Sequence, residues 1–420
     1  MNGKQNIESF YVFNTGCIRR AIDMLYLQRY FQKNGLKYVE NIKKADLIII
    51  ATCGVVKKNE ENSLKAIEIA VRKKRKDATI VVSGCLPVIN PEPIRKIGDF
   101  YFITSGKLDE FDNFINAKIK FNDVEQPDSI RDNKILINYL IARSFCRKSK
   151  IYRFLFYRYF FNKYFLSLSV VGNNILNRLK NLIFLKETKK IIPYYSIKIA
   201  DGCNSECSFC ATKYAIGKIK SVPIEKIIKQ FKEGLNKGYR IFQLIAEDTG
   251  CYGIDIGKDL AELLEKIFEI KGNYKLVIID CSPRWIIEKK ERILPVLVKN
   301  QDKIKEIFLP IQSGSNKILK DMNRKYKIED VKEVISEIRQ KAPKINIRTT
   351  FIVGFPGETE DDFNQTVEII KSFDFDEVTI NRYEDRPKTL SSRFVNKIPP
   401  DIIEERVKYL EKNLGCKILS

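Results

Sequence analysis

The fold of this chain is constrained most by a repeated alternation of short apolar runs with longer stretches of helical spacing. Near the N-terminus the apolar runs are residues 10–13, 45–51 and 78–83, and the helical stretches are residues 21–33 and 62–72. Strands that alternate with helices are typical of a parallel sheet covered by helices. The pattern therefore predicts an open α/β domain in this part of the chain.

The same alternation returns after residue 193. It predicts strands at residues 196–200, 240–246, 274–280, 306–310, 346–353 and 377–380, and helices at residues 223–236, 258–271 and 400–413. A series of βα units is expected to form a barrel or a partial barrel, with its active site at the carboxyl ends of the strands. We therefore expect an α/β chain of four parts: a flavodoxin-like open parallel-sheet domain (1–115), a connector (116–192), a partial TIM barrel (193–400) and a C-terminal helix (401–420).

Three cysteines of the first domain occupy equivalent places. Cys17, Cys53 and Cys85 each follow one of the predicted strands, within the tripeptides Thr-Gly-Cys, Thr-Cys-Gly and Ser-Gly-Cys. Because ligands bind at the carboxyl edge of an open α/β sheet, we expect these thiols to converge there, although they are far apart in sequence. Free cysteine is also common in buried packing positions. The repeated local pattern favours a shared metal site over packing alone.

The first strand of the second region leads into a loop with the spacing CxxxCxxC. Its cysteines are Cys203, Cys207 and Cys210. Soft thiolates at this spacing suit an iron–sulfur cluster, and three protein ligands leave one iron of a four-iron cluster open, as catalysis requires. Zinc is the competing metal, but zinc sites usually combine paired CxxC units or histidines. The chain has no histidine and no second CxxC unit, so the loop predicts an iron–sulfur cluster.

The charge of the chain indicates an anionic partner. Lysine and arginine number 75 against 53 acidic residues, a net charge of +22, which is typical of proteins that bind nucleic acid or a membrane surface. Basic and aromatic residues alternate within residues 141–192, where Glu187 is the only acidic residue. Such a segment suits phosphate and base contacts, an anionic membrane surface, or a helical connector packed on the larger domain. These three interpretations stay open.

The N-terminal residues MNGKQNIESF contain no apolar signal region. The longest uncharged run of the basic segment, residues 164–177, is too short to span a bilayer. Ten cysteines spread over 420 residues do not resemble the dense disulfide framework of a small secreted protein. We therefore expect a cytoplasmic protein with no transmembrane span and with reduced thiols.

Further segments carry a resemblance to a known family. They are residues 309–316 (LPIQSGSN), 322–324 (MNR), 351–359 (FIVGFPGET), 210–215 (CATKYA) and 247–255 (EDTGCYGID). With both cysteine sets, they make residues 8–412 similar to the radical S-adenosylmethionine (SAM) methylthiotransferases. The last two segments are most similar to the archaeal and eukaryotic enzymes that act on threonylcarbamoyladenosine in tRNA.

The resemblance implies insertion of a methylthio group into a C–H bond of that tRNA nucleoside. It also implies two 4Fe-4S clusters, one on each cysteine set, together with SAM, an electron donor of the flavodoxin or ferredoxin type, and a sulfur donor. The cluster on Cys203, Cys207 and Cys210 would cleave SAM to a 5′-deoxyadenosyl radical. Two alternatives remain: a related enzyme with a protein, peptide or small-molecule substrate, and an RNA-binding iron–sulfur protein without turnover.

Six residues are implied as contacts of SAM. They are Phe209 beside the adenine, Glu247 and Asp248 at the amino group or ribose, Gln312 and Ser313 at a strand end, and Arg324 at the carboxylate. The sequence leaves an ordinary structural role open for four of them. Phe209 could pack the loop, Glu247 and Asp248 could cap the following turn, and Arg324 could form a surface salt bridge.

Four positions depart from the family pattern. Arg20 stands where the family usually has asparagine, and Glu247 stands where glutamine is common. Thr350 replaces a common aspartate, and Ile216-Gly217 replaces an Arg-Gly pair. Because of these departures, the resemblance predicts the type of reaction more firmly than the substrate.

The C-terminal region also departs from the family pattern. The family continues into a small β-barrel, called TRAM, that helps to bind the substrate, whereas the predicted helix at residues 400–413 is soon followed by Ser420. We therefore expect a chain without TRAM. If the substrate is tRNA, the basic segment at residues 141–192 would replace TRAM in RNA binding.

Overall fold

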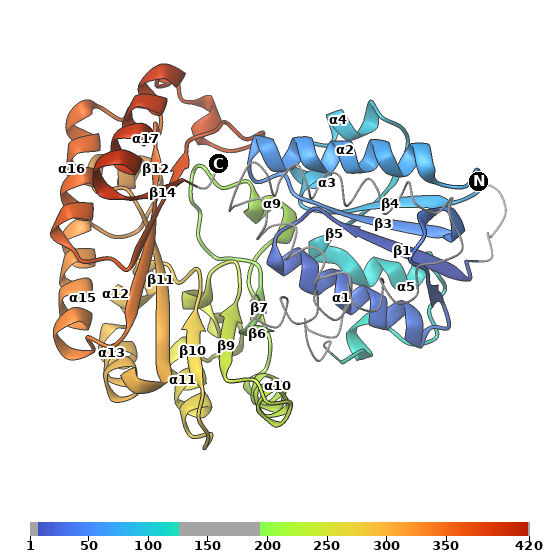
Figure 1. Cartoon of the computed structure of the whole chain (residues 1–420), viewed down its shortest axis with the longest axis horizontal. Helices are drawn as coiled ribbons and strands as arrows, with labels where there is room; N and C mark the ends of the chain where they lie inside the picture. Colours follow the sequence, from blue (N-terminus) through green and yellow to red (C-terminus); the bar gives the residue numbers. More distant parts are fainter. Residues whose placement is uncertain (1–6, 126–193, 419–420) are drawn as a thin grey trace, which may run out of the picture.

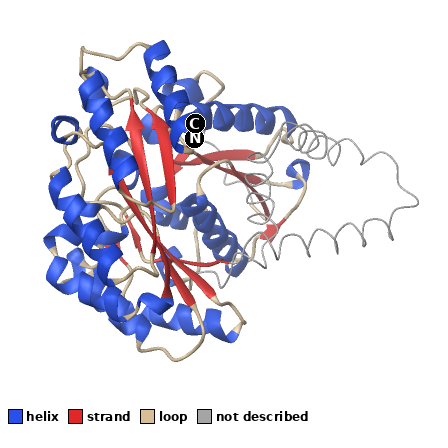
Figure 2. Ribbon diagram, turned by 60° about the vertical axis from the view of Figure 1, so that its left-hand side comes forward, coloured by secondary structure: helices blue, strands red, loops and turns tan. Residues whose placement is uncertain are grey.

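The computed structural model describes residues 7–125 and 194–418. Two domains lie side by side, each built on a parallel sheet with helices packed against it (Figures 1 and 2). The basic segment at residues 141–192 lies outside the described residues, so the predictions about it remain predictions. Within the described ranges, no helix is long and apolar enough to cross a membrane.

The first domain holds a five-stranded parallel sheet. Its strands are β1 (Ser9–Asn14), β2 (Lys37–Tyr38), β3 (Leu47–Thr52), β4 (Thr79–Gly84) and β5 (Tyr101–Thr104). Their order is β2-β1-β3-β4-β5, and every neighbouring pair is parallel. This is the flavodoxin-like order, in which the chain reverses its direction of winding between β1 and β3, and ligands bind outside the carboxyl ends at that point. The sequence-based prediction of an open parallel sheet is confirmed.

Helices cover both faces of this sheet. They are α1 (Ile18–Lys33), α2 (Lys57–Lys73), α3 (Leu86–Ile89), α4 (Glu92–Arg95) and α5 (Phe111–Phe114), with the 3-10 turns η1 (Ile42–Lys44), η2 (Ser105–Glu110) and η3 (Phe121–Asp123). All six residues of β3 are buried, because α1 and α5 pack on one face of the sheet and α2, α3 and α4 on the other. The first core extends to Val124, which is buried against the face that carries α1.

The second domain holds a seven-stranded parallel sheet. Its strands are β6 (Tyr194–Lys198), β9 (Ile241–Ile245), β10 (Lys275–Ile278), β11 (Ile304–Gln312), β12 (Asn346–Val353), β13 (Glu377–Arg382) and β14 (Lys417–Ile418). They are arranged in chain order, and among the described residues β6 pairs only with β9 and β14 only with β13. The sheet is therefore a partial barrel, as predicted.

The helices of the second domain follow its strands. They are α9 (Thr212–Ile216), α10 (Ile224–Asn236), α11 (Leu260–Phe268), α12 (Pro283–Glu288), α13 (Lys290–Lys299), α14 (Asn316–Asp321), α15 (Ile328–Lys341), α16 (Glu360–Ser372) and α17 (Pro400–Leu414). The short elements are β7 (Ala200–Asp201), β8 (Lys220–Ser221), η5 (Thr249–Cys251), η6 (Ile254–Ile256), η7 (Gln301–Lys303) and η8 (Ser391–Arg393). In α10, Ile224, Ile227 and Phe231 form a buried stripe at helical spacing, which fixes that helix against the strands.

The helix predicted at residues 258–271 is shorter in the structure. Asp259 caps α11 by accepting the backbone N–H of Glu262 at 3.0 Å, so the helix begins at Leu260 and ends at Phe268. The helix predicted at residues 62–72 begins earlier, at Lys57, and therefore starts immediately after the loop that carries Cys53.

Candidate metal centres at the domain interface

The structure brings Cys17, Cys53 and Cys85 to one edge of the first sheet. They follow β1, β3 and β4, which are neighbours in the sheet and end at the same level. Cys53 and Cys85 are buried, and Cys17 is half-buried at the N-terminus of α1. The paired strand ends place all three cysteines at this edge. Their predicted convergence at this edge is therefore observed.

A close approach of β3 and β4 positions two of these cysteines. Gly84 has a φ of +96°, and a Cβ atom there would lie 2.2 Å from the carbonyl oxygen of Thr52. The next residue, Cys85, donates its N–H to that same oxygen at 3.1 Å. Ser63 on α2 accepts the N–H of Cys53 at 3.0 Å. Backbone contacts at the strand ends thus fix the loops of Cys53 and Cys85 relative to each other.

The thiols of this set differ in acidity. Burial raises the pKa of Cys53 and Cys85. Burial also opposes ionisation of Cys17, but the positive charges of Arg19 and Arg20 outweigh it and lower the pKa of that thiol. Cys17 also stands at the N-terminus of a long helix, a position that favours a thiolate. Cys17 is therefore the thiol of this set most ready to bind a metal.

The second set lies on the loop between β7 and α9. Cys203 donates its N–H to the carbonyl of Gly217 at 3.2 Å, and Cys210 donates to the carbonyl of Cys207 at 3.3 Å. The N–H of Ser205 points at the sulfur of Cys203 at 3.2 Å. Burial and the neighbouring Cys207 raise the pKa of Cys210. Backbone hydrogen bonds thus hold the first and last cysteines of this loop in place.

Arg324 connects this loop to the barrel sheet. Its Nη1 donates to the sulfur of Cys207 at 3.2 Å, and its Nη2 donates to the carbonyl of Pro310 at 2.9 Å and to Ser282 Oγ at 3.1 Å. Its Nε donates to the hydroxyl of Tyr326 at 2.8 Å. One guanidinium thus connects the cysteine loop to β11 and to the N-terminus of α12. The predicted contact of Arg324 with SAM stays a prediction.

Asp248 is buried directly behind Cys203. Its Oδ1 accepts the N–H groups of Gly250 and Ser282, each at 3.1 Å, and its Oδ2 accepts the indole N–H of Trp285 at 2.7 Å. Burial raises the pKa of this carboxyl. The three donors tie Asp248 to η5 and α12, and the hydroxyl of Ser205 on the cysteine loop donates to its Oδ2 at 3.3 Å.

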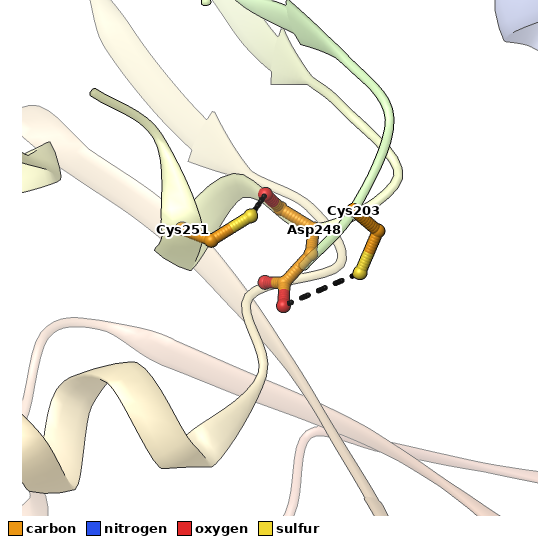
Figure 3. Close-up of side chains that lie close together, drawn as sticks. All are labelled: Cys203, Asp248 and Cys251. Atoms are coloured by element: carbon orange, nitrogen blue, oxygen red, sulfur yellow. Dashed lines mark hydrogen bonds between the residues drawn. The ribbon is translucent and has the colours of Figure 1, made fainter. Parts of the chain in front are cut away.

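Cys251 joins Asp248 and Cys203 in a compact group that was not predicted from the sequence. Figure 3 shows the three side chains, whose ligand atoms all lie within 4.8 Å of one another. The thiol of Cys251 donates to the carbonyl of Asp248 at 3.2 Å, and the sulfur of Cys203 lies 4.0 Å from Oδ2 of Asp248. The sequence did contain a signal, because Cys251 lies six residues after the end of β9, but it belongs to neither of the two cysteine motifs.

Glu247 lies between the two cysteine sets. One carboxylate oxygen accepts the N–H of Gly202, and the other accepts Nη2 of Arg20, each at 3.1 Å. Arg19 of the first domain reaches Asp280 at 2.7 Å and the carbonyl of Ala246 at 3.1 Å. Neither arginine was predicted as a site residue. Both carboxylate oxygens of Glu247 have protein partners, and its contact with SAM stays a prediction.

The end of β11 carries the predicted residues Gln312 and Ser313. Gln312 has a φ of +79°, unusual for a residue other than glycine, and its buried Oε1 has no hydrogen-bond partner among the described residues. Ser313 is fully buried, and its Oγ accepts the N–H of Ser315 at 3.2 Å. Strained backbone and unpaired polar atoms gather at ligand sites. This strand end therefore fits a bound polar ligand.

Phe209 lies in a separate apolar group under the cysteine loop. It packs against a small cluster made of Ile318, Met322, Ile352 and Phe355. The adjacent Ser208 donates its N–H to the carbonyl of Met322 at 2.9 Å. These contacts fix the loop from below, and the predicted position of Phe209 beside an adenine stays a prediction.

The two cysteine sets belong to elements that pack on each other. Helix α3 begins directly after Cys85, and α9 begins shortly after Cys210; these helices touch across the domain interface (Figure 1). The buried residues Cys85, Ile89, Ala211, Ala215 and Ile216 form one apolar cluster there. Ile216, which replaces the arginine of the family pattern, is part of this packing.

Both donor sets fit an iron–sulfur cluster. All six cysteines are free thiols, and each set offers three of them. In each set an N–H group is directed at a sulfur atom: Asn59 Nδ2 at Cys53 at 3.7 Å, and Arg324 Nη1 at Cys207 at 3.2 Å. Thiolates with such donors suit a cluster with one open iron.

Two family models match the chain. Residues 197–370 match the Radical SAM superfamily, and residues 9–104 match the Uncharacterized protein family UPF0004. The first match contains the CxxxCxxC loop and most of the partial barrel. The second contains the sheet domain with Cys17, Cys53 and Cys85.

Curated relatives are similar over nearly the whole chain. A probable threonylcarbamoyladenosine tRNA methylthiotransferase from Pyrococcus abyssi is 30% identical, covering 96% of this chain and 83% of the relative. The threonylcarbamoyladenosine tRNA methylthiotransferase MtaB from Aquifex aeolicus is 31% identical, covering 94% and 85%. The ribosomal protein uS12 methylthiotransferase RimO from Thermosipho africanus is 29% identical, covering 96% and 82%.

Solved structures share the fold at low identity. The radical SAM methyltransferase TsrM from Kitasatospora setae, with cobalamin and a 4Fe-4S cluster bound, superposes with a TM-score of 0.61 at 13% identity, covering 92% of this chain and 77% of its own. The cobalamin-dependent radical SAM enzyme OxsB gives 0.54 at 14% identity, covering 97% and 56%. The likeness extends over both domains.

Proposed function

The chain belongs to the radical SAM methylthiotransferases, and on this basis we propose that it transfers a methylthio group to threonylcarbamoyladenosine in tRNA. Membership makes it a SAM-dependent radical enzyme with an iron–sulfur cluster. The substrate is the proposed part. It is supported by curated relatives named for this tRNA nucleoside, which are 30% and 31% identical over more than nine-tenths of this chain.

A protein substrate is the second candidate, and a specific observation favours it. Relatives named for ribosomal protein uS12 are 28% and 29% identical over the same share of the chain, so overall identity separates the two substrates weakly. The segment from Glu247 to Asp255, which contains the partners of Gly202 and Cys203, resembles the tRNA enzymes and gives tRNA precedence.

We propose two 4Fe-4S clusters, one on each cysteine set. Bound clusters and SAM supply radical generation and sulfur. Cys17, Cys53 and Cys85 hold the cluster of the first domain. Cys203, Cys207 and Cys210 hold the cluster of the barrel. Packing of α3 on α9 keeps both sets at one buried interface, which excludes water from the reacting groups.

The proposed SAM contacts surround the second-domain cysteine loop. Gln312 and Ser313 offer a strained strand end with an unpaired amide oxygen, and Arg324 touches both Cys207 and β11. Asp248 accepts the hydroxyl of Ser205 on the loop at 3.3 Å and is itself held by Trp285 and Ser282. The family resemblance predicts that Phe209, Glu247 and Asp248 bind SAM. Their contacts in the structure support the cysteine loop.

The remaining partners follow from the chemistry. A methylthiotransferase needs an electron donor of the flavodoxin or ferredoxin type and a sulfur donor, and we propose both for this protein. A tRNA substrate would place it in the cytoplasm. The basic segment at residues 141–192 is proposed to contact RNA, with an anionic membrane surface as the less favoured alternative.

Nucleoside mass spectrometry tests this function. The protein is produced in a host whose tRNA contains threonylcarbamoyladenosine but no methylthio derivative of it, alongside the Cys203→Ala variant as control. The expected result is methylthio-threonylcarbamoyladenosine with the wild-type protein only. Absence of that nucleoside while the purified protein cleaves SAM would contradict the tRNA proposal, and a mass increase of one methylthio group on ribosomal protein uS12 would favour the second candidate.

A further inference from the structure

A buried group of charges fills the space between the two cysteine sets. Arg20 and Asp23 on α1 pair at 2.9 Å and are each 1% exposed. Asp23 also binds Lys198 Nζ at the end of β6 at 2.8 Å, and Arg20 binds Glu247 after β9 at 3.1 Å. The same helix therefore contacts the carboxyl ends of two barrel strands through ion pairs that are screened little by water.

Glu247 links the two cysteine sets through its two carboxylate oxygens. Arg20 lies on the first turn of α1, where the N–H of Ala21 binds the carbonyl of Cys17 at 2.9 Å. Its guanidinium binds one oxygen of Glu247, and the other oxygen accepts the N–H of Gly202, the residue before Cys203. One carboxylate thus holds the backbone of one cysteine loop and the helix that begins at the other.

Opposite charges from the two domains meet at this point. Arg20 Nη2 lies 3.1 Å from Oε1 of Glu247, and the side chains are 1% and 7% exposed. Gly16 makes room for the arginine, because a Cβ atom at Gly16 would lie 2.5 Å from the Cβ of Arg20. Two residues far apart in sequence therefore form one buried ion pair.

We infer that Arg20 and Glu247 act as a paired positioning bridge that fixes the Cys17 loop relative to the Cys203 loop. The inference rests on the proposed two-cluster function and goes beyond it by assigning part of the relative placement of the two centres to a named ion pair. Arg19 also lies 3.4 Å from Glu247 and 2.7 Å from Asp280, so the pair belongs to a larger buried group of charges. Removal of either partner of the bridge unbalances that group, whereas removal of both leaves its net charge unchanged. A bridge of this kind predicts that the two substitutions compensate each other.

The test compares four variants with wild type: Arg20→Asn, Glu247→Gln, the double variant, and a control double variant, Glu60→Gln/Arg386→Gln. The control removes another buried ion pair between the domains, which joins α2 to the segment after β13. Two readouts are taken on anaerobically reconstituted protein. One is hydrogen exchange of Gly202 and Ala21, and the other is the methylthiolated product formed per 5′-deoxyadenosine released.

Each single variant is expected to speed exchange at Gly202 by about tenfold or more, since a charge-assisted hydrogen bond is weakened or lost. Product per 5′-deoxyadenosine is expected to fall by about one to two orders of magnitude, the cost of misplacing reacting groups by about 1 Å. The double variant is expected to lie closer to wild type than either single variant. The control pair is expected to leave exchange at Gly202 unchanged.

Multiplicative effects in the double variant, or the same exchange pattern in the control pair, would overturn the bridge. Failure of the proposed function is distinguishable, because wild type would then release 5′-deoxyadenosine without methylthiolated nucleoside. The exchange readout needs no substrate, so it decides the bridge in that case as well.

Discussion

The two cysteine sets differ in how the fold brings their sulfur atoms together. Cys17, Cys53 and Cys85 come from three strands, and only the parallel register of the sheet places them at one edge. Cys203, Cys207 and Cys210 come from one loop, which is held in place by contacts with Glu247, Met322 and Arg324. The first set is brought together by the register of its sheet, whereas the second is already close in sequence and is oriented by contacts from other parts of the barrel.

In each domain, one glycine allows a close backbone approach next to a cysteine. Gly84 lets two strand ends approach, and Gly202 lets a loop turn back toward β8. Both have positive φ angles, and a Cβ atom would lie 2.2 Å from a backbone oxygen at Gly84 and 2.1 Å from one at Gly202. Substitution at these positions should separate the two centres experimentally.

Gly84→Ala is expected to have the largest effect. The new Cβ would collide with the carbonyl and amide of Thr52 inside the sheet, where neither strand can move freely. We expect a loss of about 3 kcal/mol or more in the free energy of unfolding and loss of the first-domain iron, with the barrel iron retained. Urea unfolding and iron analysis measure this. Gly35→Ala is the matched control, since Gly35 has a similar φ of +88° but no neighbour within 4 Å, and it should cost about 1 kcal/mol.

Gly202→Ala is expected to have the next largest effect. Its Cβ would lie 2.1 Å from the carbonyl of Lys218, but a loop relaxes more readily than a sheet. We expect a loss of about 2 kcal/mol and loss of the barrel iron alone. Gly238→Ala, at a φ of +84° with no neighbour within 4 Å, serves as control. If either glycine variant removed iron from both centres, the two sites would not be structurally independent.

Asp248→Asn should lower the free energy of unfolding, with a smaller effect on the barrel centre than Gly202→Ala. An amide keeps one acceptor oxygen, so either the indole of Trp285 or the two backbone N–H groups of Gly250 and Ser282 lose their partner. We expect a loss of about 1–3 kcal/mol in unfolding free energy, the cost of leaving a buried donor unpaired. Thermal unfolding of the reconstituted protein measures it. Unchanged stability would show that this carboxylate does not hold the loop.

The smallest expected effect is a difference in alkylation rate among Cys17, Cys53 and Cys85 in the metal-free protein. Arg19 and Arg20 lower the pKa of Cys17, whereas burial raises the pKa of Cys53 and Cys85. Thiolate is the reactive form, so Cys17 should react with iodoacetamide faster than the other two near neutral pH, by about tenfold for each unit of pKa difference. Its rate should also level off at a lower pH. Peptide mass spectrometry follows the three residues, and equal rates would contradict this order.

The comparison also explains what the sequence could predict. Strands such as Leu47–Thr52 were placed within about two residues, because a run of buried apolar residues has few other structures open to it. The CxxxCxxC set is local and was read from spacing. The other set followed from the rule that parallel strands end at the same edge, so its convergence was predictable once each cysteine was seen to follow a strand.

Contacts between domains were not predictable in the same way. The pairing of Arg20 with Glu247 depends on how two sheets are placed relative to each other, which no periodicity or spacing encodes. Cys251 reaches Asp248 and Cys203 because the chain turns tightly in η5 after β9. The contacts of such residues depend on the tertiary structure, so residue type alone does not predict them.

Iron counting combined with electron paramagnetic resonance tests the central claim that each cysteine set holds its own cluster. Wild type is compared with Cys17→Ala/Cys53→Ala/Cys85→Ala and with Cys203→Ala/Cys207→Ala/Cys210→Ala after anaerobic reconstitution with iron and sulfide. We expect about eight iron atoms per wild-type chain and about four in each triple variant, with one cluster signal retained in each. A wild-type protein with about four irons, all lost in the second variant, would contradict the claim.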